Sequence, residues 1–308
     1  MTLKSLLFLI ATTNVLGVIQ KEYKQKKYSS IHNIYTANIN SLPKSWSWDN
    51  INGTHYLTKN LNQHIPQYCG SCWAHGAISA LGDRIKIARG GKSPDINLAV
   101  QFLLNCGNAG TCNGGDHLAA YEFIYNYGSI PFDTCLAYEA CSDDSEELNC
   151  KHKDYTCKPE NVCRTCSTFT NLGGKCKSIY PYPNATIYKY GTVSGYKNMM
   201  HEIYNNGPIA CGINANEILS YRGGLLDVPD KSNEVDHIIS IVGWGYDKNT
   251  DKQYWNIRNS WGEYWGEMGY VRVVLGENQL GTESNCAWAL PKTWTELNVP
   301  CDENGENC

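Results

Sequence analysis

The segment Cys69-Gly-Ser-Cys72 ends on a cysteine that is suited to nucleophilic chemistry. Apolar residues after Cys72 recur at helical spacing as far as Arg89, and Gly90 follows as a stop signal. Cys72 is therefore expected at the start of a helix. A thiol attacks carbonyls as its thiolate, and both a helix N-terminus and a nearby imidazolium lower the thiol pKa toward that form. Cys72 has the helix N-terminus by its position, and the imidazolium must come from a histidine.

His237 is the favoured partner among the eight histidines because it opens a long apolar run. A buried strand there would hold the imidazole rigidly, as a general base requires. Asn259 closes the strand-like segment 253–258, where its amide oxygen could accept the imidazole N–H. Trp261 could then shield that hydrogen bond from water.

Each of these residues also has a purely structural interpretation. A lone histidine at a strand end is usually structural, and an asparagine before Ser-Trp-Gly is usually a turn residue. His75, three residues after Cys72 on the same predicted helix, is a rival base. Its apolar neighbours favour a place in the core instead.

Taken together and in this order along the chain, these residues resemble the papain family of cysteine proteases. The resemblance favours the catalytic interpretation over the structural ones. The matching residues are Gln63, Cys69-Gly-Ser-Cys72-Trp, His237 and Asn259-Ser-Trp-Gly. His237 lies 165 residues after Cys72, compared with about 130 to 150 in typical members, and a cysteine-rich insertion would absorb the excess. The resemblance implies an α+β, two-lobed fold with the active site in the cleft between a helical lobe (42–178) and a β-rich lobe (179–290).

The resemblance also assigns roles within an acyl-transfer reaction. Cys72 would be the nucleophile, His237 the acid and base, and Asn259 the group that orients the imidazole. Gln63 and the backbone N–H of Cys72 would form the oxyanion hole, with Trp261 as the shield. No cofactor or metal is implied.

Gly114-Gly115 matches the paired glycines that, in this family, let a substrate backbone approach closely; an ordinary turn is the alternative. The region around them is rich in Cys, Asn, Asp and Gly and has little periodicity, which indicates loops held by disulfides. Five strands are expected later in the chain. Their ranges are 187–193, 208–214, 237–244, 253–258 and 270–275.

Gln63 lies nine residues before Cys72, where papain-like enzymes usually have about six, so three residues are inserted. The segment His64-Ile-Pro-Gln-Tyr68 looks like the mini-loop of the cathepsin X group, also called cathepsin Z. Such a loop can wall off the leaving-group side of the cleft, and an imidazole on it can bind a terminal carboxylate. The resemblance thus implies a carboxypeptidase that removes single residues, with His64 as the carboxylate anchor.

Several alternatives stay open. Gln67, five residues before Cys72, could replace Gln63 in the oxyanion hole, and His64 could be an ordinary loop residue. A loop that leaves the cleft open would give a papain-like endopeptidase. The scaffold could also serve a secreted binding protein without catalysis.

Fifteen cysteines, an odd number, indicate an oxidising compartment and one unpaired thiol, expected at Cys72. A zinc site at Cys163 and Cys166 is the less favoured use. Residues 1–17 have the pattern of a signal peptide, 18–41 that of a removable propeptide, and 291–308 that of an exposed tail. By resemblance, and for the last two pairs by elimination, the disulfides are Cys69–Cys112, Cys106–Cys157, Cys135–Cys163, Cys166–Cys176, Cys211–Cys286, Cys141–Cys150 and Cys301–Cys308.

Charge and targeting signals limit the partners. The chain carries −4 overall, but its first 41 residues hold five Lys and one Glu, so the remainder is more acidic still. Nucleic acid is therefore an improbable partner, and no stretch is long enough to span a membrane. We expect a monomer in the secretory pathway, in lysosomes or outside the cell, that acts on peptides with free C-termini. Asn52 and Asn184 begin N-glycosylation sequons.

Overall fold

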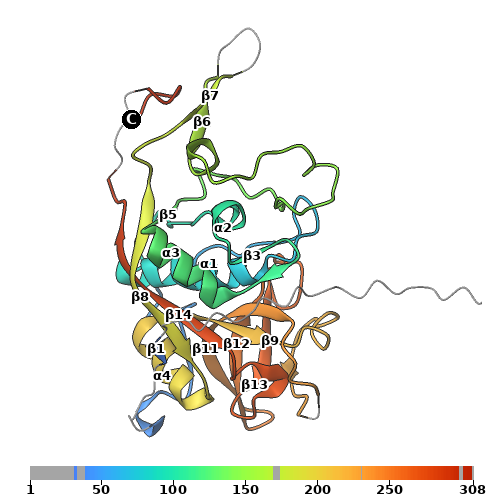
Figure 1. Cartoon of the computed structure of the whole chain (residues 1–308). Helices are drawn as coiled ribbons and strands as arrows, with labels where there is room; N and C mark the ends of the chain where they lie inside the picture. The colour runs from blue at the N-terminus through green and yellow to red at the C-terminus, as the bar shows by residue number, and fades with distance from the viewer. Residues whose placement is uncertain (1–30, 33–38, 169–173, 230, 298–300, 307–308) are drawn as a thin grey trace, which may run out of the picture.

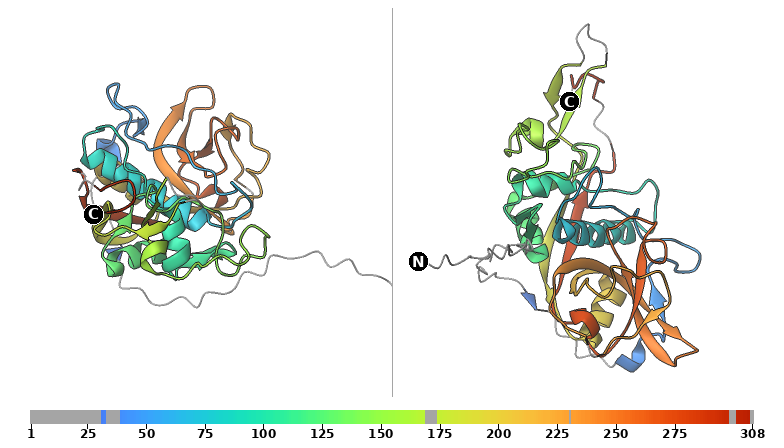
Figure 2. Two further views of the ribbon diagram at one scale, coloured as in Figure 1. Left: turned by 90° about the horizontal axis from the view of Figure 1, so that it is seen from above. Right: turned by 90° about the vertical axis from the view of Figure 1, so that its right-hand side faces the viewer.

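The structure is a computed structural model that describes residues 31–32, 39–168, 174–229, 231–297 and 301–306. The predicted signal peptide and most of the predicted propeptide lie outside these residues. Figures 1 and 2 show helices packed against a large twisted sheet, with an extended segment that carries β6 (Arg164–Cys166) and β7 (Cys176–Ser178) at one end of the molecule.

The helical lobe is built around α1 (Cys72–Ala88), in which every residue from Trp73 to Lys86 is buried. Two further helices, α2 (Val100–Cys106) and α3 (His117–Tyr127), complete this lobe (Figure 1). The side chain of Asp116 accepts a hydrogen bond from the backbone N–H of Ala119 and so caps α3, which ends at the left-handed Gly128. The predicted helix after Cys72 is therefore present and ends one residue earlier than expected.

A ten-stranded mixed sheet forms most of the second lobe. Its strands have the order β1-β8-β14-β9-β11-β12-β13-β10, with β2 paired to β11 and β5 paired to β8. Their bounds are β1 Ile31–His32, β2 Trp46–Ser47, β5 Ile130–Pro131, β8 Asn184–Val193, β9 Ile209–Ile213, β10 Leu225–Leu226, β11 His237–Asp247, β12 Lys252–Arg258, β13 Tyr270–Val274 and β14 Cys286–Trp294. All five predicted strands are present within this sheet.

Two large apolar cores lie in the described part of the chain, and α1 contributes to the first of them. One surrounds Trp73, Phe102 and Tyr121 in the helical lobe, and the other surrounds Trp244 and Trp255 in the β-rich lobe. Helix α4 (Tyr196–Asn206) packs on the second core, and the sequence analysis did not anticipate it. The two cores confirm the predicted α+β fold with two lobes.

Two boundaries differ from the sequence analysis. The predicted tail 291–308 begins inside β14, since Thr293 pairs with Thr186 and Trp294 with Ala185 on β8. Ile31 and His32, which lie in the predicted removable propeptide, pair in parallel with Gly191 and Thr192 on the same strand. Strand pairing with a distant segment leaves no local periodic signal, which is why the sequence pattern missed both.

Six disulfides join pairs of residues within the described part of the chain. They are Cys69–Cys112, Cys106–Cys157, Cys135–Cys163, Cys141–Cys150, Cys166–Cys176 and Cys211–Cys286, the same pairs that the resemblance and elimination gave. Both cysteines of the zinc alternative, Cys163 and Cys166, are thus disulfide-bonded. Of the remaining predicted pair, Cys301–Cys308, the residue Cys308 lies outside the described residues.

Candidate active site

Cys72 is the first residue of α1 and a free thiol. The helix approaches β11 closely because Gly76 has no side chain: a Cβ there would lie 2.8 Å from Cγ2 of Ile238 and 3.2 Å from the carbonyl oxygen of Ile239. This close packing brings the N-terminus of α1 to the beginning of β11, where His237 lies.

Burial raises the pKa of the Cys72 thiol to about 11, while the backbone N–H groups of Ile238 and Trp73 act in the opposite direction. The Ile238 contribution places the sulfur beside the residue that directly follows His237. Burial lowers the pKa of His237 to about 4. Each group on its own therefore favours its neutral form, and a charged thiolate–imidazolium pair depends on the attraction between the two.

The imidazole of His237 is held by Asn259. Its Nε2 lies 2.8 Å from Oδ1 of Asn259, and the same oxygen accepts the backbone N–H of Ser260, which fixes it as an acceptor. Nε2 of His237 therefore carries the proton and donates. This tautomer leaves Nδ1 with the lone pair that a general base uses.

Trp261 covers this hydrogen bond. Its ring centroid lies 4.9 Å from that of His237, at an interplanar angle of 32°. His237 and Asn259 are 5% and 4% exposed, so their hydrogen bond is shielded from water. In such surroundings the hydrogen bond is electrostatically stronger than in solvent.

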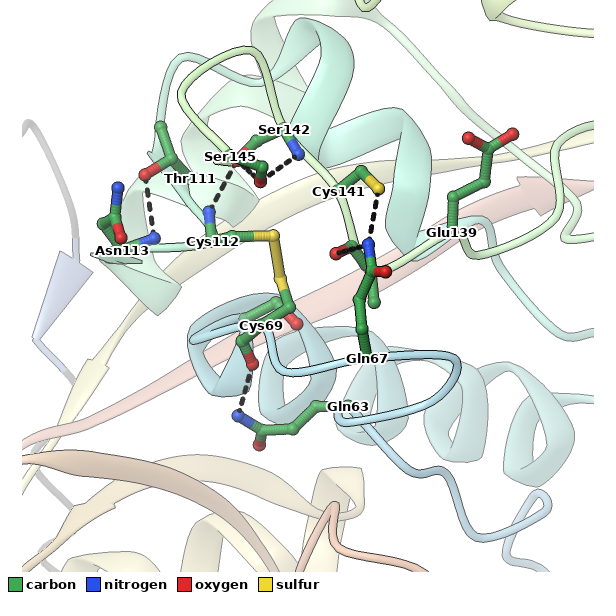
Figure 3. The surroundings of a disulfide bond; sticks show 12 residues. Gln63, Gln67, Cys69, Thr111, Cys112, Asn113, Glu139, Cys141, Ser142 and Ser145 are labelled. Atoms are coloured by element: carbon green, nitrogen blue, oxygen red, sulfur yellow. Dashed lines mark hydrogen bonds between the residues drawn. A yellow bond between two sulfur atoms is a disulfide. The ribbon is translucent and has the colours of Figure 1, made fainter. Parts of the chain in front are cut away.

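Gln63 is buried, and both ends of its side-chain amide have hydrogen-bond partners. Its Nε2 donates to the carbonyl oxygen of Cys69 at 3.0 Å (Figure 3). Its Oε1 accepts the hydroxyl of Ser260 at 2.8 Å. Because an amide nitrogen has two hydrogens, one N–H of Gln63 is left for a substrate oxygen. Gln63 thus has the fixed orientation that an oxyanion donor needs.

Gln67, the alternative oxyanion residue, is engaged elsewhere. Figure 3 shows its amide turned toward Cys141, and its Nε2 lies 3.3 Å from the carbonyl oxygen of Ala140 and 2.9 Å from Sγ of Cys141. Asn149 donates to its Oε1 at 3.2 Å. These contacts tie the mini-loop, residues 64–68, to the disulfide-rich region.

His64 begins this mini-loop. Its ring stacks on Tyr68 with centroids 5.0 Å apart and an interplanar angle of 12°. Nδ1 of His64 is buried and has no hydrogen-bond partner among the described residues. Burial lowers the pKa of His64, and a charge on His64 lowers the pKa values of His75 and His237.

His75, the rival base, occupies a different environment. Its Nδ1 lies 3.0 Å from the carbonyl oxygen of Ser71, and its ring packs edge-on against Tyr138 at 4.8 Å. Burial lowers its pKa to about 4. The ring is therefore held by contacts inside the helical lobe rather than by Asn259.

Two residues without an assigned role complete the site. The hydroxyl of Tyr138 donates to the carbonyl oxygen of Gln63 at 2.7 Å and lies 2.7 Å from Oγ of Ser71, the residue before the nucleophile. Ser260 joins Gln63 to the asparagine segment. Tyr138 lies in a region with no periodic signal, so only its three-dimensional contacts reveal it.

Gly114 and Gly115 form β4, which pairs with β3 (Gly110–Thr111) beside Trp73. A Cβ on Gly115 would come within 2.6 Å of the Trp73 ring. Gly114 has φ of 119° with open space around it, a conformation that favours glycine and leaves its backbone approachable.

The remaining predicted features are peripheral. Asn52 is exposed in a turn, whereas Asn184 is half-buried and donates from Nδ2 to the carbonyl oxygen of Tyr182. Within the described ranges, no group of three or more His, Cys, Asp or Glu residues could hold a metal ion. No helix among the described residues is long and apolar enough to cross a membrane.

Comparison with known proteins places these features in context. Residues 42–290 match the model of the papain family cysteine proteases. The chain is 42% identical over 280 residues to cathepsin Z of Onchocerca volvulus, covering 88% of this chain and 85% of that protein. It is 31% identical over 239 residues to cathepsin B-like cysteine proteinase 6 of Caenorhabditis elegans, covering 73% and 60% of the two chains.

Solved structures of similar fold include two proteases. The bromelain protease of Ananas comosus, in complex with the inhibitor E64, has a TM-score of 0.61 at 25% identity and covers 80% of this chain and 99% of its own. Digestive procathepsin L2 of Tenebrio molitor has a TM-score of 0.64 at 22% identity, covering 85% and 74%. The latter likeness shows the fold alone.

Proposed function

The chain belongs to the papain family of cysteine proteases, and from that premise we propose that it is a carboxypeptidase that removes single residues from the C-termini of peptides. The observation that carries the proposal is the buried, unpartnered Nδ1 of His64 on a loop near His237. An unsatisfied buried nitrogen is costly, and a substrate carboxylate would satisfy it.

The bond-breaking step uses Cys72 and His237. Nδ1 of His237 takes the thiol proton as the sulfur attacks the scissile carbonyl carbon, so that proton transfer and attack proceed together. This coupling suits two groups whose buried forms are neutral. The negative charge that develops on the carbonyl oxygen is stabilised by the free N–H of Gln63 and by the backbone N–H of Cys72.

Collapse of this intermediate breaks the C–N bond. The leaving amino acid takes the proton from His237, and the peptide remains attached to Cys72 as a thioester. A water molecule then gives a proton to His237 and attacks the thioester, which releases the shortened peptide and restores the thiol. Asn259 keeps the imidazole in one orientation throughout both halves of the reaction.

The mini-loop decides which bond is cut. A donor on His64 binds the terminal carboxylate of the leaving residue, which places the last peptide bond at Cys72. Gln67 and Tyr68 support the loop through their contacts with Cys141 and His64. An endopeptidase would need this side of the cleft to be open, and a partnerless His64 nitrogen gives it no advantage.

Oxidising conditions fit the proposed location. Six disulfides among the described residues favour the secretory pathway, with the lysosome or the exterior as the destination. A signal peptide over 1–17, a propeptide over 18–41 and glycans at Asn52 and Asn184 belong to the same proposal.

Mass spectrometry of peptide products tests the activity. The purified enzyme is incubated with one peptide in its free-acid form and with the matching C-terminal amide. We expect a ladder of single-residue losses from the acid and slow or no cleavage of the amide. Internal cleavage of both forms at equal rates would favour the endopeptidase, and failure of a thiol-directed peptidyl epoxide to label Cys72 would favour the non-catalytic binding protein.

A further inference from the structure

A cavity of 320 Å³ lies inside the helical lobe, behind the helix that carries Cys72. One stripe of α1 lines it through His75, Ile78, Ser79 and Gly82, and segments near 58–62, 96–100 and 133–138 supply the opposite walls. Cys72 and His237 do not line it, so the cavity is distinct from the peptide cleft. Its volume is in the range of small-molecule sites in proteins.

The walls of this cavity are largely apolar. The aliphatic side chains that line it are Leu61, Ile78, Ile96, Leu98, Val100 and Leu136. At the solvent-exposed edge, Lys59 and Asp133 form an ion pair at 2.8 Å, with 54% and 31% of their side chains exposed. Because these two charges compensate each other, the edge favours an uncharged ligand.

His75 supplies a polar group on this wall and is only 2% exposed. The hydroxyl of Tyr138 gives its single proton to Gln63, so the Ser71 hydroxyl donates to Tyr138 and the Ser71 carbonyl oxygen accepts from Nδ1 of His75. The proton of this neutral imidazole is therefore on Nδ1, and Nε2 is an acceptor.

No residue in the described part of the chain donates a hydrogen bond to Nε2 of His75. A ligand that fills the cavity must bring a donor of its own, or leave this acceptor unpaired at a cost. Tyr138 also lines the cavity, with its ring at 84° to that of His75, so an aromatic ligand has an aromatic side chain to pack against.

From these contacts we propose that the cavity binds a small uncharged phenol, whose ring packs on the apolar wall and whose hydroxyl donates to Nε2 of His75. This ligand site goes beyond the proposed peptidase activity. It lies one side chain away from the oxyanion residue, because Tyr138 lines the cavity and also holds the carbonyl group of Gln63.

Three matched probes test the donor requirement by calorimetric titration of the full chain with Cys72 blocked as a methyl disulfide. The probes are 4-ethylphenol, 4-ethylanisole, which keeps the oxygen but has no donor, and ethylbenzene. We expect 4-ethylphenol to bind about threefold to tenfold more tightly than either of the others, the worth of one hydrogen bond. Equal affinities of the phenol and the anisole, or no saturable binding of the phenol, would overturn the proposal.

Variants then locate the site. His75→Phe keeps a ring but removes the acceptor, so the preference for the phenol should vanish, while the matched exposed change His55→Phe should preserve it. Ser79→Leu should fill the cavity and weaken all three probes. A phenol preference that persists in a folded His75→Phe chain contradicts the proposal; if that variant does not fold, the probe series on the unchanged residue and Ser79→Leu decide.

Discussion

The two sides of the candidate active site are held in place by different means. On the sheet side, His237 begins β11 and Asn259 directly follows β12, and both strands contribute to a core that includes Trp244 and Trp255. On the opposite side, the region 106–178 has four disulfides within it, and the local cluster around Cys141 contains three buried apolar residues. Apolar packing thus fixes the strand that carries His237, whereas covalent links and side-chain hydrogen bonds fix the mini-loop and Gln63.

This difference predicts which parts of the site are most sensitive to amino-acid substitutions nearby. Strand register sets the position of a side chain through many backbone hydrogen bonds, so no single substitution on a neighbouring residue should displace it. A loop held by a few polar contacts has fewer supports. We therefore expect distant substitutions to affect substrate preference and oxyanion binding on the disulfide-rich side more than they affect the base.

The largest loss of activity should come from substitutions on the sheet side of the site. His237→Ala removes the proton acceptor and should lower kcat/KM by about two to four orders of magnitude. Asn259→Ala removes one hydrogen bond to an imidazole that remains present, so its cost should be about tenfold. The order is the prediction, and an Asn259→Ala enzyme that is less active than His237→Ala at the same acidic pH contradicts it.

Two disulfide deletions sharpen the comparison. Cys211→Ser with Cys286→Ser opens a loop of 75 residues in the sheet and should cost about 4 to 5 kcal/mol of unfolding free energy; Cys141→Ser with Cys150→Ser opens a loop of 9 and should cost about 2 to 3. The second pair contacts Gln67, so only its loss should reduce the preference for free-acid peptides. Denaturant unfolding measures the free energies, and kcat/KM on matched free-acid and amide peptides measures the substrate preference. The comparison fails if loss of the Cys211–Cys286 disulfide changes this preference more than loss of Cys141–Cys150 does.

Tyr138→Phe tests the hydrogen bonds on the disulfide-rich side. Loss of the hydroxyl frees the carbonyl group of Gln63, so kcat should fall about threefold to tenfold with KM nearly unchanged. Tyr155→Phe, which removes another hydroxyl bonded to a backbone carbonyl in the same region, is the matched control. Equal kinetic losses in both variants would mean that Tyr138 has no special link to the oxyanion hole.

The smallest effect concerns pH. Burial lowers the pKa of His64, so the free enzyme loses the His64 charge as pH rises through a value below 6.5. The ratio of kcat/KM for a free-acid peptide to that for its amide should then fall a few-fold from acidic to neutral pH. Dividing by the amide rate cancels the titration of Cys72 and His237. A ratio that stays constant or rises with pH would argue against a charged His64.

The sequence pattern placed Cys72 and His237 correctly in the fold because each begins an element with a clear hydrophobic pattern. Cys72 begins an apolar helix pattern and His237 begins a continuous buried strand, so position and chemistry coincided. Spacing alone left two candidate bases, His237 and His75. The order of the motifs along the chain favoured His237 as the partner of Asn259. The structure places His237 and Asn259 2.8 Å apart.

Other features have no local signal. Tyr138 contacts Gln63 and Ser71 across separations of 75 and 67 residues, from a loop whose shape depends on disulfides. The continuation of β14 to Trp294 depends on its pairing with β8, and α4 followed a stretch in which only strands were expected. Such contacts arise from tertiary packing, which a periodic pattern does not encode.

The His64→Ala variant tests the proposed carboxypeptidase activity most directly. A charge-assisted hydrogen bond contributes about 1.5 to 3 kcal/mol, so kcat/KM on a free-acid peptide should fall by about one to two orders of magnitude. The matching amide should lose little. His55→Ala serves as an exposed control, and labelling of Cys72 by a small thiol reagent verifies an intact site.

The decisive quantity is the acid-to-amide ratio of kcat/KM for one peptide, measured in the unchanged enzyme and in His64→Ala. The account predicts that the ratio falls by about tenfold to a hundredfold in the variant, because only the acid form uses the imidazole. An unchanged ratio would contradict the account, since His64 would then not be the carboxylate anchor.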